Sequence, residues 1–100
     1  MAIEAYVPLF VQVGDHLIDR AILLTLYEPD GDNPSGSVTT ERPLPEGAGG
    51  TLRLEATRGG ESWLVAADQI SVVNSSAVGF EFAMSSRPTR EIISESSPET

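Results

Sequence analysis

His16, the only histidine, is the side chain best suited to acid–base chemistry at neutral pH. Asp15 and Asp19 lie close to it in sequence, and a histidine oriented by a carboxylate can act as a general base. Nucleophilic catalysis would also need a serine, and no serine lies in the glycine-x-serine-x-glycine context of a nucleophile elbow. We therefore expect His16 to be a turn residue, and we expect neither catalytic residues nor enzyme activity.

A second pattern has the ligand spacing of a calcium loop. Asp30, Asp32 and Glu41 occupy its first, third and twelfth positions. The fifth and sixth positions are Pro34 and Ser35, where an EF-hand has an acid or amide and then glycine. Because aspartate, proline and glycine are also common turn residues, we expect no metal and no cofactor. A calcium-binding or small-molecule-binding β-barrel is kept as an alternative.

The charge of the chain limits its partners. Fifteen acidic residues stand against six arginines, no lysine is present, and the net charge is −9. Such a charge repels nucleic acid and anionic lipid, so we expect a protein partner or a homo-oligomer, with no nucleic acid and no membrane. The absence of cysteine excludes thiolate chemistry and disulfides. No basic lead precedes the first apolar stretch, so we expect no signal peptide and a cytoplasmic or virion location.

The clearest structural signal lies between Thr51 and Met84, where apolar and polar side chains alternate as in β-strands. Gly59-Gly60 can supply the positive backbone angles of a tight hairpin, so 51–58 and 61–67 are expected to pair antiparallel. A further strand over 70–73, a turn at 74–76 and a last strand are expected next. The side chains expected to face inward are Leu52, Leu54, Ala56, Trp63, Val65, Ala67, Val78, Phe80, Phe82 and Met84.

Two apolar stretches precede this region. Residues 1–13 alternate, with Ile3, Val7 and Val11 on one face and Tyr6 on the other. Since Pro8 cannot donate to a ladder, this strand is expected at a sheet edge or with a bulge. Residues 17–27 are apolar on both faces; their β-branched and aromatic ending favours a buried strand, with a helix as the alternative.

Two segments lack a sustained period, so we expect a single β domain over 1–86, with a long loop at 28–50, followed by an acidic Ser/Glu-rich tail at 87–100. Within the loop, residues 37–40 could pair briefly with a sheet edge. Loops and tails often carry binding residues. Arginine can bind a carboxylate through two hydrogen bonds, and a short apolar strand can add to a partner's sheet edge. The partner-binding residues expected on these grounds are Arg42, Arg87, Arg90, Ile92 and Ile93.

Together these features predict an all-β fold: a small antiparallel β-sandwich or partly open β-barrel of five to seven short strands, with at most one short helix. The expected function is that of a non-catalytic structural or interaction protein, a small acidic β subunit that docks on a larger protein assembly. A decorating or accessory subunit of a viral particle would be one instance. An acidic antagonist that masks a basic surface of a target protein is a further alternative.

Overall fold

Eight β-strands make up the fold in the computed structural model, which describes residues 2–18, 20–29 and 33–93. Within these residues no helix is present, so the all-β prediction is confirmed and the helical alternative for 17–27 is wrong. No helix of the described part is therefore long and apolar enough to cross a membrane. The strands are β1 (Ala2–Val13), β2 (His16–Ile18), β3 (Ala21–Glu28), β4 (Ser35–Thr40), β5 (Gly49–Arg58), β6 (Glu61–Ser76), β7 (Gly79–Met84) and β8 (Thr89–Ile92).

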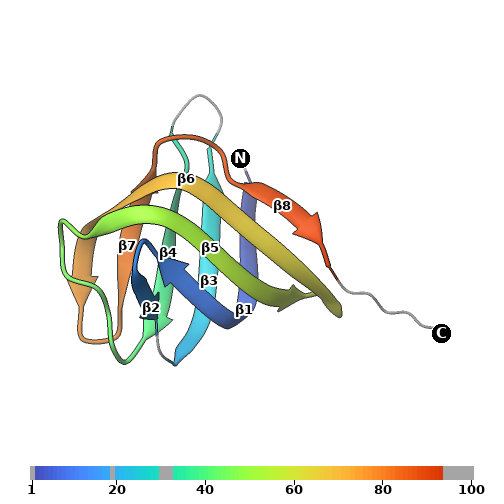
Figure 1. Cartoon of the computed structure of the whole chain (residues 1–100), viewed down its shortest axis with the longest axis horizontal. Helices are drawn as coiled ribbons and strands as arrows, with labels where there is room; N and C mark the ends of the chain where they lie inside the picture. The colour runs from blue at the N-terminus through green and yellow to red at the C-terminus, as the bar shows by residue number, and fades with distance from the viewer. Residues whose placement is uncertain (1, 19, 30–32, 94–100) are drawn as a thin grey trace.

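Six of the strands close into an antiparallel barrel in the order β1-β3-β4-β7-β6-β5, and pairing between β5 and β1 completes the circle. The two remaining strands lie outside it, β2 on β1 and β8 on β6. In Figure 1, β5 and β6 cross in front of β3, β4 and β7. The barrel is thus closed rather than partly open, and eight described strands replace the five to seven expected. Each barrel strand thus has two barrel neighbours, although β7 pairs only with the last part of β6 and the edge of β6 at 63–66 pairs with β8 instead.

A β-bulge in β1 lets this strand pair with β3 in its first half and with β5 in its second half. The register shifts between Pro8 and Phe10. A one-residue shift exchanges the two faces of a strand. Tyr6 is therefore buried before the bulge and Val11 after it, while Ile3 and Val7 face outward. The bulge expected from Pro8 is confirmed, but the single continuous face predicted for residues 3–13 is wrong.

The segment 28–50 is not one long loop, because β4 lies within it and fills the barrel wall between β3 and β7. The apolar–polar alternation of β4 is weak because one of its inward positions is Gly36, which is buried and has no side chain. The ring of Phe82 occupies the space instead, with its Cζ atom 2.5 Å from the point where a Gly36 Cβ would lie. The core side chain at this position is thus supplied by the neighbouring strand.

The β5–β6 hairpin forms as predicted, with Gly59 and Gly60 at φ angles of 62° and 83° in the turn. The strand β6 then continues without a break to Ser76, so no turn lies at 74–76. The turn comes one step later, at residues 77–78, and Val78 is 71% exposed there rather than inward-facing.

One apolar core fills the barrel. Leu54 and Phe80 are buried as predicted, and Trp63 is partly buried and packs against the same cluster. Its largest fully buried side chains are Tyr6, Phe82, Leu24, Leu26, Leu52, Leu54, Ile70 and Met84.

Candidate functional site

An exposed group of apolar side chains lies on the outside of β1, β2 and β3. We call it the outer apolar face. Scattered single apolar residues are ordinary on protein surfaces, but a contiguous group is not. Its members range from 37% to 67% exposed and are Ile3, Val7, Leu9, Leu17, Ile22 and Leu23.

Strand register makes this face continuous. Ile3 pairs with Tyr27 and Ala5 with Thr25 across β1 and β3, and outward residues two positions apart share one face. Leu9 and Leu17 line one hollow of about 170 Å³ at the end of the face where β1 and β2 meet the start of β3. The outward side chains where β1 pairs with β3 carry no charge, so the centre of the face offers apolar and uncharged polar contacts.

A shallow groove adjoins the outer apolar face. It crosses β3, β4 and β7 and reaches β6, with a volume of about 340 Å³, and Tyr27, Ser35, Val73 and Ala83 are among its lining residues. Because Tyr27 is the register partner of Ile3, the groove and the face share a border. The small side chains of β4 make the groove, and a protruding side chain of a partner could enter it.

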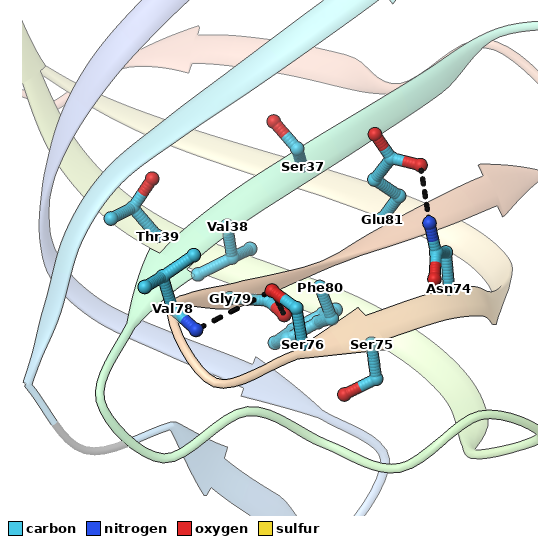
Figure 2. A pocket seen from close by; sticks show the side chains of 10 residues that line it. All are labelled: Ser37, Val38, Thr39, Asn74, Ser75, Ser76, Val78, Gly79, Phe80 and Glu81. Carbon is cyan, nitrogen blue, oxygen red and sulfur yellow. Dashed lines mark hydrogen bonds between the residues drawn. The ribbon is translucent and has the colours of Figure 1, made fainter.

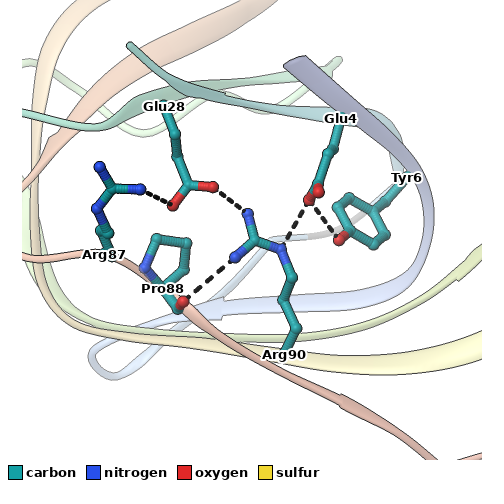
Figure 3. Close-up of polar contacts among 6 residues, drawn as sticks. All are labelled: Glu4, Tyr6, Glu28, Arg87, Pro88 and Arg90. Atoms are coloured by element: carbon teal, nitrogen blue, oxygen red, sulfur yellow. Dashed lines mark hydrogen bonds and ion pairs between the residues drawn. The ribbon is translucent and has the colours of Figure 1, made fainter. Parts of the chain in front are cut away.

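A network of ion pairs holds β8 against one end of the barrel (Figure 3). The guanidinium of Arg90 donates from Nε to Glu4 Oε1 at 2.7 Å and from Nη2 to Glu28 Oε1 at 2.5 Å. Its Nη1 donates to the carbonyl oxygen of Pro88 at 3.3 Å, and the Tyr6 hydroxyl donates to Glu4 Oε1 at 2.8 Å. We call Glu4, Tyr6 and Glu28, which lie on β1 and β3, the arginine cradle.

The network is partly buried, and this sets its electrostatics. Burial raises the pKa of Glu4, but hydrogen bonds from Tyr6 and Arg90 outweigh burial and hold that pKa below its ordinary value. Burial, together with the hydrogen bond to Glu4, raises the pKa of Tyr6. Burial lowers the pKa of Arg90, yet the bonds to Glu4 and Glu28 more than offset it and raise that pKa. The guanidinium therefore stays charged across the physiological range.

The structure places the residues predicted for partner binding in different settings. Arg42 is exposed, and its backbone amide donates to Thr40 Oγ1. Arg87 is exposed with its Nη1 3.9 Å from Glu28 Oε2, whereas Arg90 is engaged by the cradle. Ile92 and Ile93 are 50% and 40% exposed.

The short apolar segment 91–95 was expected to add to a partner's sheet edge; its first residues instead belong to β8, which adds to the edge of β6 in the same chain, and residues 94–95 lie outside the described part. Arg90 pairs with Val65 and Ile92 with Trp63 in antiparallel register, and the Ile93 amide donates to the Ser62 carbonyl. Sequence reasoning missed the cradle, because Glu4 and Arg90 are separated by 86 residues and no local pattern joins them. The alternation of residues 1–13 was visible in the sequence, but which of the two faces is buried was not predicted, and residues 17–27 were expected to be buried on both faces.

A polar hollow lies at the β6–β7 turn (Figure 2). Its volume is about 200 Å³, and Ser37, Thr39, Ser76 and Glu81 are among its lining residues. The Asn74 amide donates to Glu81 Oε1 at 3.5 Å across it. Small-molecule sites usually measure about 300–1,000 Å³ and are mostly apolar, so this hollow is a weak candidate for ligand binding.

The residues considered for catalysis and calcium are only partly described. His16 is exposed at the start of β2, and Glu41 pairs with Arg20 at 3.4 Å on the surface. Asp19, Asp30 and Asp32 lie outside the described residues. Among the described residues, no group of three or more histidine, aspartate or glutamate side chains could hold a metal ion.

Comparison with protein-family models, curated proteins and solved structures gives no match.

Proposed function

We propose that this protein is a non-catalytic interaction subunit that docks on a larger protein assembly through the outer apolar face. The observation that supports it is the six large apolar side chains that share one side of β1, β2 and β3 while remaining exposed. Contiguous exposed apolar groups mark protein contacts, membrane contacts or ligand grooves, and the net charge of −9 disfavours an anionic membrane. A decorating or accessory subunit of a viral particle is one assembly role that fits.

The size of the face indicates a modest affinity for each contact. Full burial of a Val, Leu or Ile side chain gains about 1.5–3 kcal/mol, and these six are near half-exposed, so covering them gains roughly 6 kcal/mol. Association costs an estimated ~4–15 kcal/mol before any surplus appears. The face therefore needs added contacts, which the adjoining groove and a charged rim can supply. Repeated sites on an assembly would add avidity.

The charge of the chain indicates which residues should surround the contact surface on such a partner. At a net charge of −9, the protein is attracted to a surface whose apolar centre is surrounded by basic residues. Salt would then slow and weaken docking. A pure antagonist of a basic surface would need acidity alone, so the apolar face favours docking over masking.

A pair of valine substitutions tests this proposal. Val7 and Val78 are 57% and 71% exposed, but only Val7 belongs to the outer apolar face, and Val78 does not line the adjoining groove. We expect Val7→Glu to abolish co-purification of a stoichiometric protein partner with the tagged chain, and Val78→Glu to retain it. Circular dichroism checks that both variants fold. Equal retention by both variants would refute docking through this face.

A further inference from the structure

The strand β8 is held as a bound peptide is held by a sheet edge. It pairs antiparallel with β6, from Thr89 opposite Ala66 to Ile92 opposite Trp63. The Thr89 hydroxyl donates to the Ala66 carbonyl at 3.3 Å, and the Ile93 amide donates to Ser62 at 3.0 Å. Main-chain bonds of this kind give affinity in β-strand addition, and side-chain pockets give specificity.

The arginine cradle supplies that specificity. Both carboxylates come from the barrel, Glu4 on β1 and Glu28 on β3, and their side chains are 22% and 10% exposed. The planar guanidinium of Arg90 bridges them through two different nitrogen atoms. A lysine ammonium is a compact point charge and cannot match this fork geometry. Without an arginine at position 90, the two acids would face each other in a partly buried site, and the exposed Arg87, 3.9 Å from Glu28 Oε2, would not bridge them.

The strand is also a separable part of the fold. It is the last strand described, and it pairs with β6 alone. The Ser85 amide still bonds to the Gln69 carbonyl of the barrel, so residues 86–88 form the connection. Removing β8 would break no pairing between other strands.

From these features we infer that the β6 edge and the arginine cradle form a binding site for an extended strand with arginine two residues before isoleucine. The site accepts β8 of a second copy as well as its own. A second copy of the chain carries the same β8, the segment that occupies this site in the structure. Exchange of β8 between two copies keeps the ladder and the cradle contacts and changes only the path of residues 86–88. The site lies apart from the outer apolar face, so it does not rest on the proposed docking function.

Full-length Arg90→Ala provides a host whose own β8 is weakened. The probe is a fluorescein-labelled peptide of residues 86–93, and Trp63, the single tryptophan and the register partner of Ile92, is a second reporter. We expect saturable binding by anisotropy together with a change in Trp63 emission. Peptides with alanine or lysine in place of Arg90 should bind roughly ten- to a hundredfold more weakly. Arg90→Lys serves as the host if Arg90→Ala does not fold. Equal affinities for the three peptides, or no binding to a folded host, would overturn the site.

Disulfide trapping tests exchange between two copies. The chain has no cysteine, so Thr89→Cys and Ala66→Cys, at register partners, can be made singly and mixed. Mild oxidation should give a mixed disulfide whose yield rises with protein concentration, because paired residues on antiparallel strands lie within disulfide range. The control replaces Ala66→Cys with Ser71→Cys, a β6 position that pairs with β7 rather than β8. Equal yields in the two mixtures would overturn the second copy as an occupant.

Discussion

Replacing Gly36 by alanine should destabilise the barrel by overpacking. A Cβ atom at this position would lie 2.5 Å from Phe82 Cζ and 2.8 Å from the carbonyl oxygen of Thr25. Favourable carbon–carbon contacts lie near 3.5–4.0 Å, so both distances are far inside the repulsive range. Phe82 is fully buried and the Thr25 oxygen belongs to the backbone of β3, so neither neighbour can move away freely.

The size of the effect follows from these contacts. Forcing one extra carbon into a packed core costs about 1–3 kcal/mol, and two fixed neighbours place Gly36→Ala near the upper end, at about 2–3 kcal/mol. For a domain of this size, each kcal/mol lowers the melting temperature by about 4–8 °C. The direction of the change in the free energy of unfolding tests overpacking, because Gly→Ala at an unstrained open position instead stabilises by about 0.4–1 kcal/mol.

Urea titration followed by Trp63 fluorescence measures this loss. Ser37→Ala, the next residue of β4, is the control and should change the free energy of unfolding by less than about 0.5 kcal/mol. In the double variant Gly36→Ala/Phe82→Leu the smaller side chain relieves the clash with the ring but not with Thr25. Its loss should therefore be smaller than the sum of the two single losses. A loss below about 0.5 kcal/mol for Gly36→Ala would refute the packing argument.

Three further outcomes are expected. Arg90→Met should lower the free energy of unfolding by about 2–3 kcal/mol at neutral pH, because it removes the guanidinium from two partly buried carboxylates and leaves Glu28 with only the 3.9 Å contact to Arg87. The pKa of Glu4 is lowered in the folded state from an ordinary value of 4.5. The stabilisation that ionised Glu4 gives the folded state is therefore complete above pH 4.5 and is lost as pH falls through the lowered pKa. Urea titrations at neutral and acid pH should therefore show the difference between wild type and Arg90→Met narrowing in acid. Gly60→Ala should cost about 1 kcal/mol in a thermal melt through backbone strain alone, because its φ is 83° and no neighbour lies within 4 Å of an added Cβ. His16→Ala should change stability by less than about 0.5 kcal/mol and leave partner binding intact in the co-purification assay.

Local patterns predicted the parts of the fold that local patterns determine. The β5–β6 hairpin follows from alternation on both sides of Gly59-Gly60, and the bulge in β1 follows from Pro8. The strand β4 was expected only as a brief edge pairing at 37–40 and not as part of the barrel wall, because Gly36 leaves its inward side empty and Phe82 fills the space from another strand.

The candidate surfaces were harder to predict for a related reason. A bulge exchanges the faces of β1, so the apolar residues before it point outward although their alternation is regular. The position of the register shift decides which residues of β1 form the core, and the sequence does not show at which residue the shift occurs. The arginine cradle depends on residues from β1, β3 and β8 that meet only after the barrel closes.

The sharing of β1 between two layers also determines how the chain must fold. The hairpins β5–β6 and β6–β7 join neighbours in sequence, whereas β1 must find β5 across some forty intervening positions, from Val13 to Leu52. Loop-closure entropy opposes such distant pairing, and barrels of this kind fold in about milliseconds to seconds. Until β1 docks, its buried and exposed apolar residues all face water. The interval before closure is therefore the period in which a newly made chain is most exposed to aggregation, and it should lengthen when substitutions at the bulge slow the docking of β1.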